Sequence, residues 1–159
     1  MRNPKWDVWL YRSITKFFAD RLTDYPTFIE GQERSTSQEP IRLEIRCDGP
    51  FQTKLSRDNY KLWTEVNILV IVAEQVDRLK IHEISGIVAS KFEECLPIYK
   101  YGDPDDDAEN TGDLLTVFKL RPRSGSEDVI KTYYGKLDPK TNIHQATLEG
   151  HYYGYLTGV

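Results

Sequence analysis

The longest alternating segment of the chain is YKLWTEVNILVIVAEQ, residues 60–75. Alternate residues of a strand point to opposite sides of a sheet, so the segment divides into two faces. One face suits a protein core throughout and carries Leu62, Thr64, Val66, Ile68, Val70 and Val72. The other face begins polar and ends apolar, in the order Trp63, Glu65, Asn67, Leu69, Ile71 and Ala73. We predict a long strand whose second face is covered at its apolar end and is open, or contacts another chain, at its polar end.

Four other segments have strand character. PIRLEIRCDGP, residues 40–50, separates its apolar and charged positions, and its DGP ending predicts a turn. We expect this strand to pair antiparallel with the long strand, across the polar connection 51–59. The other three strand-like segments are LLTVFKLR at 114–121, VIKTYYGKL at 129–137 and IHQATLEGHYYGYLTG at 143–158. A short extended piece, TFIEG, is predicted at 27–31.

Two segments have the spacing of amphipathic helices. The first, residues 5–22, has an apolar stripe of Trp6, Trp9, Leu10, Ile14, Phe17, Phe18 and Leu22. The second, residues 79–96, ends at Pro97 and has an apolar stripe of Ile81, Ile84, Val88, Phe92 and Cys95. The element order predicts a single α+β domain over residues 1–159, with a mostly antiparallel sheet and two helices packed on one face. Residues 98–113 and 122–140 are predicted to be extended or flexible excursions.

Composition narrows the range of partners. The net charge of −4 gives no overall attraction to nucleic acid or to an anionic membrane. No apolar run approaches the roughly 20 residues that span a bilayer. The first ten residues, MRNPKWDVWL, lack the apolar centre of a signal peptide, so we expect the protein to be made and kept in a cytoplasm. Cys47 and Cys95 are interpreted as small buried residues, with a disulfide as the less favoured alternative.

The charged residues and histidines offer few candidates for a catalytic or metal site. The three histidines, His82, His144 and His151, are not spaced as metal ligands along the chain. Asp103, Asp105 and Asp107 begin a calcium-loop pattern that fails at Ala108 and Leu114, which favours a solvated acidic loop. A magnesium-dependent nuclease site built from Glu44, Glu65 and Lys61 is an alternative. The simpler interpretation is cross-strand pairing of Arg42 and Arg46 with Glu44 and Glu65 on one exposed sheet face. No catalytic, metal or cofactor site is therefore predicted.

Aromatic residues suggest an interface. The chain has ten tyrosines, and consecutive pairs such as Tyr133–Tyr134 and Tyr152–Tyr153 place one ring on each face of a strand. Tyrosine is favoured at protein interfaces because it adds contact area with little loss of entropy. The predicted oligomer interface consists of Arg42, Glu44, Arg46, Trp63, Glu65, Asn67, Tyr133, Tyr134, Tyr152 and Tyr153.

The order of elements resembles a known family. A first helix is followed by the extended YPTFIEG segment, the strand PIRLEIRCDG, a polar link and the long strand WTEVNILVIVAEQ. A helix, a strand, an irregular acidic segment and a closing strand complete the order. This arrangement resembles the tail terminator, or tail-completion, proteins of long-tailed bacteriophages and their relatives in the neck and tail. The resemblance extends from about residue 5 to residue 157.

The resemblance implies a non-catalytic structural protein of the virion, made in the cytoplasm of a bacterial host. Family members form rings, commonly of six copies, that cap the tail tube and join it to the head-side connector or neck proteins. DNA would pass through such a ring without sequence recognition, and no membrane or cofactor is implied. Three alternatives stay open: another head–tail connector (a stopper or adaptor) or a tail-tube protein, the small nuclease above, and a non-viral ligand-binding α+β module.

Overall fold

The computed structural model describes residues 3–30, 40–73, 78–101, 112–121, 129–136 and 143–157. It has two helices, α1 (Trp6–Arg21) and α2 (Arg78–Ser90). Its strands are β1 (Thr27–Ile29), β2 (Ile41–Lys54), β3 (Asn59–Ala73), β4 (Cys95–Tyr99), β5 (Leu114–Leu120), β6 (Val129–Lys136) and β7 (Ile143–Thr157). The strand order is β1-β2-β3-β7-β5-β4, with β6 also paired to β7. Only the β1–β2 pair among these is parallel, so the predicted α+β class with a mostly antiparallel sheet is confirmed.

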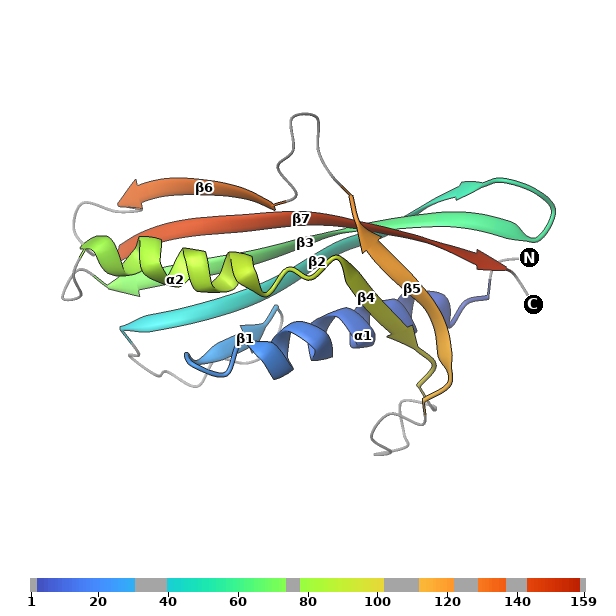
Figure 1. Cartoon of the computed structure of the whole chain (residues 1–159), viewed down its shortest axis with the longest axis horizontal. Coiled ribbons are helices and arrows are strands. Elements are labelled where there is room, and N and C mark those ends of the chain that lie inside the picture. The colour runs from blue at the N-terminus through green and yellow to red at the C-terminus, as the bar shows by residue number, and fades with distance from the viewer. Residues whose placement is uncertain are drawn as a thin grey trace.

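The sheet curls around helix α1. This helix contacts β2, near one end of the strand order, and β4, at the other end. The indole Nε1 of Trp9 donates a hydrogen bond to the Tyr101 carbonyl oxygen at 2.9 Å, and the Ser13 hydroxyl accepts one from the Tyr99 N–H at 2.9 Å. Figure 1 shows both helices on the same side of the long strands. We call the side that faces the helices the concave face and the other side the convex face.

The concave face contains the hydrophobic core. All six positions predicted for it in β3, from Leu62 to Val72, are buried. Strand β7 pairs with β3 along its full length and adds Ala146, Leu148, Tyr152 and Leu156. Its two concave-face glycines leave room for rings from other elements: a Cβ on Gly150 would lie 2.7 Å from the Phe92 ring, and one on Gly154 would overlap Phe118. Both helices bury their predicted apolar stripes here, apart from Cys95.

The predicted ends of one strand and one helix were wrong. Strand β2 does not end at the DGP sequence but passes through an irregularity between Asp48 and Phe51, where Gly49 adopts a positive φ of 105°, and continues to Lys54. Helix α2 ends at Ser90, before Phe92 and Cys95. Cys95 instead begins β4 and is exposed. Proline lacks an N–H but fits in a strand at the edge of a sheet, and this explains Pro97 within β4.

The cysteines and the two predicted excursions agree only in part with the expectations from sequence. The two cysteines are free thiols, and Cys47 is half-buried as a small apolar residue would be. Strand β6 lies within the predicted excursion 122–140, and β4 continues to Tyr99 within 98–113. The aspartates of the predicted acidic loop, Asp103, Asp105 and Asp107, lie outside the described residues. In the described part of the chain, neither helix has the length and apolar character needed to cross a bilayer.

Candidate functional site

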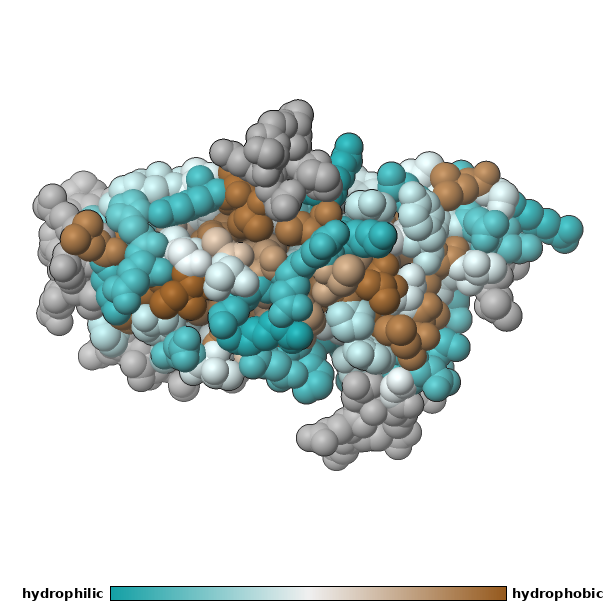
Figure 2. Space-filling model, in the orientation of Figure 1, coloured by the Kyte–Doolittle hydropathy of each residue, from teal (hydrophilic) through white to brown (hydrophobic). Residues whose placement is uncertain are grey.

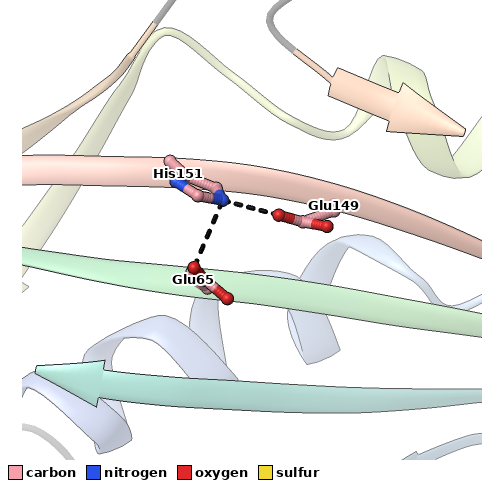
Figure 3. Close-up of side chains that lie close together, drawn as sticks. All are labelled: Glu65, Glu149 and His151. Atoms are coloured by element: carbon pink, nitrogen blue, oxygen red, sulfur yellow. Dashed lines mark hydrogen bonds and ion pairs between the residues drawn. The ribbon is translucent and has the colours of Figure 1, made fainter. Parts of the chain in front are cut away.

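The convex face brings polar residues of β3 and β7 together. Glu65 lies opposite His151 in the β3–β7 register, and Asn67 lies opposite Glu149. Because residues two apart on a strand share a face, Glu149 and His151 point to the same side as Glu65. Figure 3 shows the His151 ring between the two carboxylates, with Glu65 on the neighbouring strand. Two adjacent long strands therefore fix this group in space.

These three side chains form what we call the Glu–Glu–His cluster: Glu65, Glu149 and His151. The His151 Nε2 atom lies 2.6 Å from Glu149 Oε1 and 3.6 Å from Glu65 Oε1. One nitrogen and two carboxylate oxygens thus lie within 4.8 Å of one another. The side chains are 16% exposed for His151 and about 30% exposed for the two glutamates, so the cluster is partly shielded but open to solvent.

An aromatic row runs beside the cluster across three strands. The Phe51 ring of β2 stacks on Trp63 of β3 with 4.3 Å between ring centroids. Trp63 in turn lies nearly parallel to the His151 ring, at 6.1 Å and 15°. Trp63, backed by Phe51, therefore lies beside the imidazole of His151 with its ring nearly parallel to it.

A shallow pocket of about 120 Å³ adjoins the cluster at His151. Its other lining residues include Trp63, Tyr153, Lys61 and Arg121. The Lys61 ammonium lies 5.3 Å from the centre of the Tyr153 ring, within the range of a cation–π contact. The convex face therefore has a carboxylate-rich side and a cationic, aromatic side, which meet at His151.

Seven of the ten predicted interface residues lie on the convex face. Trp63, Glu65, Asn67 and Tyr153 are half-buried on the convex face, as are Arg42 and Arg46. Glu44 is on this face but only 5% exposed, and its carboxylate accepts a hydrogen bond from Arg46 Nε at 3.1 Å. Arg46 and Glu44 do form an ion pair, but within β2 and not across strands as predicted, and Glu65 lies beside His151.

The tyrosine pairs behave differently from each other. Tyr152 is fully buried in the core and donates its hydroxyl hydrogen to the Glu93 carbonyl oxygen at 3.0 Å, so its inclusion in the interface was wrong. Tyr153 is on the opposite face, as predicted for a consecutive pair. Tyr133 and Tyr134 are both exposed, and Tyr133 contacts His82 of α2 and His144. Tyr133 therefore lies on the concave face, on the opposite side of the sheet from Trp63.

The predicted nuclease constellation is not assembled. Glu44 pairs in register with Leu69, four residues along β3 from Glu65, a separation of roughly 13 Å at about 3.3 Å per residue. Glu65 instead meets Glu149 and His151, neither of which was predicted for the site. The only signal for them in the sequence was an acid and a histidine two residues apart in the last strand. The pairing of β7 with β3 and its register were needed to place them beside Glu65.

The Glu–Glu–His cluster is chemically suited to holding a proton or a cation between its three ligand atoms. The row of rings and the projecting strands around it are better suited to contact with another protein. Comparisons of the chain with models of known protein families and with characterised protein sequences give no match. Inference about function therefore depends on this geometry and on the order of the elements.

Proposed function

We propose that the chain is a structural subunit of a tailed bacteriophage, a tail terminator or neck protein that assembles with its own copies into a ring. In this proposal the ring lies between the tail tube and the head-side connector, surrounds passing DNA without reading its sequence, and has no catalytic role. A stopper, an adaptor or a tail-tube protein would use the same kind of self-assembly. These related roles differ in the neighbouring rings that they contact.

The exposed end of the β2–β3 hairpin supports assembly most strongly. Residues 51–59, at its end, are all exposed. Figure 1 shows the hairpin extending past both helices, so its tip is not covered by the helical layer. Phe51 and Leu55 are 43% and 54% exposed there. Figure 2 shows hydrophobic side chains beside hydrophilic ones along this projection, at the right of the view. A strand pair that leaves its own core in this way offers apolar area to another chain.

The convex face adds a second surface of suitable composition. Trp63, Tyr153 and Arg46 are half-buried on it, and tryptophan, tyrosine and arginine are enriched where protein interfaces concentrate their binding energy. A ring requires each subunit to join two different surfaces, head to tail. The hairpin tip and a separate surface of the next subunit meet this requirement, because the tip projects away from the body of the chain.

Assembly is testable with purified protein. We expect light scattering during size-exclusion chromatography to detect a species several times the 18.5 kDa mass of the chain, and negative-stain images to show rings. Leu55→Asp should shift this species to the monomer, since it places a charge in the proposed contact. Circular dichroism should be unchanged, because the side chain is exposed in the isolated subunit.

Leu79→Asp provides a matched control. Leu79 is an even more exposed leucine, 71%, in the first turn of α2, at the end of the molecule opposite the hairpin tip. It should leave the assembled species intact. A wild-type chain that stays monomeric up to its solubility limit, or rings that survive Leu55→Asp, would contradict the proposal.

A further inference from the structure

We infer that the Glu–Glu–His cluster binds a divalent transition-metal ion, for which Zn²⁺ is the best fit. The donor set is one imidazole nitrogen and two carboxylate oxygens, from His151, Glu65 and Glu149. Imidazole suits zinc and its first-row neighbours, whereas Ca²⁺ and Mg²⁺ prefer oxygen ligands alone. Three protein ligands are also the number that leaves a fourth position of a tetrahedral ion for water.

The distances are close to those that zinc requires. Bonds of about 2.0–2.1 Å in a tetrahedral site place neighbouring ligand atoms about 3.3–3.4 Å apart. His151 Nε2 and Glu65 Oε1 are 3.6 Å apart, near this value. His151 Nε2 and Glu149 Oε1 are 2.6 Å apart, the length of a charge-assisted hydrogen bond. Side-chain rotation would have to lengthen that contact by about 0.7 Å and bring the two carboxylate oxygens, which lie within 4.8 Å of each other, to the same spacing.

Charge around the cluster also favours a cation. With a neutral imidazole the three ligands carry a formal charge of −2, which a divalent ion cancels and a single proton does not. Asp48, opposite Glu65 in β2, adds a further acidic residue on the same face. The basic residues Lys61 and Arg121 line the adjoining pocket and not the Glu–Glu–His cluster itself.

The scaffold pre-organises the ligands. Glu65 is in β3, which is hydrogen-bonded to β2 and β7 on its two sides. His151 and Glu149 are in β7, which pairs with β3 on one side and with β5 and β6 on the other. Ligands on paired strands lose little freedom when an ion binds, and the stack of Trp63 on His151 restricts the imidazole further.

Titration of the purified chain with ZnCl₂ in a calorimeter tests the inference, and Trp63 gives a second, optical readout. We expect one ion per chain, and we expect Co²⁺ to quench Trp63 fluorescence because its ring stacks on the ligand His151. Glu149→Gln, which preserves shape, and His151→Ala should each weaken binding by about 100-fold or more. Even an outer hydrogen-bond partner of a metal ligand is worth roughly 10–100-fold.

His144→Ala is the matched control, because His144 is in the same strand but contacts Tyr133 on the helical side of the sheet. It should bind Zn²⁺ as the wild type does. The inference is overturned if the folded wild type does not bind Zn²⁺, if His151→Ala or Glu149→Gln binds it equally well, or if His144→Ala loses it. Glu65 is also a predicted interface residue, but all three ligands come from one chain, so a monomeric chain would still bind the ion. Metal binding and ring formation can therefore fail separately.

Discussion

The two faces of the β3–β7 strand pair are made by the same backbone but have opposite properties. On the concave face Leu62, Val66 and Ile68 are fully buried in the core cluster that also contains Phe18, Phe118 and Tyr152. One residue along, on the convex face, Trp63, Glu65 and Asn67 are half-buried and carry polar atoms. Because side chains alternate with a period of two, successive residues of one strand can supply a core on one face and a partly exposed polar surface on the other.

This difference shows where stability and function should separate. Concave positions lose packing when they are changed, and the resulting cavity or clash acts on the whole fold. Convex positions near Trp63 are half-buried, so in the proposed assembly their substitution should affect contacts with other subunits more than the fold. The apolar end of the convex face is the exception, since Leu69 and Ile71 are buried there.

The largest effect is expected from truncating a ring at the centre of the concave face. Phe18 is fully buried and contacts Phe92 and Tyr152, at 5.0 and 6.3 Å between ring centroids. Phe18→Ala should lower the free energy of unfolding by about 3–5 kcal/mol in a denaturant titration. Val8→Ala, on the exposed side of the same helix, should change it by less than about 0.5 kcal/mol. Equal losses would mean that α1 does not pack as described.

The two cysteines should differ in reactivity because Cys47 packs against the core and Cys95 is exposed. Burial, with smaller contributions from the Asp48 and Glu30 carboxylates, raises the pKa of Cys47 from 9.0 to about 12. Three pKa steps correspond to about a thousand-fold less thiolate at neutral pH, and the thiolate is the nucleophile. Iodoacetamide should therefore modify the exposed Cys95 far faster than Cys47, as followed by mass spectrometry. The difference should disappear in guanidinium chloride; comparable rates in the folded protein would contradict the burial of Cys47.

A smaller effect is expected from closing the space at a concave-face glycine. The Cβ of Gly154→Ala would overlap the Phe118 ring, and overpacking of this kind costs about 1–3 kcal/mol. Gly86→Ala, on the exposed surface of α2, meets no atom within 4 Å and should stabilise the helix by up to about 1 kcal/mol. Thermal unfolding of the two variants should shift in opposite directions. Shifts in the same direction would argue against close packing of β5 on β7.

The sequence pattern was sufficient for most of the local structure, although it did not predict β4 and placed Cys95 in a helix. The alternation in β3 identified both of its faces, and the 3.6-residue spacing identified α1 and most of α2. The pairing of β2 with β3 followed from their closeness in the chain. Their irregularity at Gly49 was missed because DGP is typical of turns, and only the continued pairing with β3 keeps the segment extended.

The candidate site could not be predicted in the same way. Glu65 is separated from Glu149 and His151 by 84 or more positions, and the register that unites them is that of β3 with β7. That register depends on the packing of the concave face, where Gly150 and Gly154 receive Phe92 and Phe118. Likewise the burial of Tyr152 and the exposure of Tyr133 depend on which elements cover each end of β7, and the alternation of residues does not specify this.

A comparison of two tryptophans tests the central claim, that the convex face serves contact with other chains. Trp6 is 2% exposed and packs edge-on against Tyr60, whereas Trp63 is half-buried on the convex face. Oligomer mass and the free energy of unfolding should be measured on Trp6→Ala, Trp63→Ala and Glu65→Lys. Unfolding should be followed at concentrations where the wild type is dissociated, because assembly itself adds stability by mass action.

We expect Trp63→Ala and Glu65→Lys to abolish the assembled species while they lower the free energy of unfolding by no more than about 1.5 kcal/mol. Trp6→Ala should lower it by about 3–5 kcal/mol. If Trp63→Ala destabilises the monomer as much as Trp6→Ala does, or leaves assembly intact, the convex face at Trp63 is ordinary structure and not a contact surface.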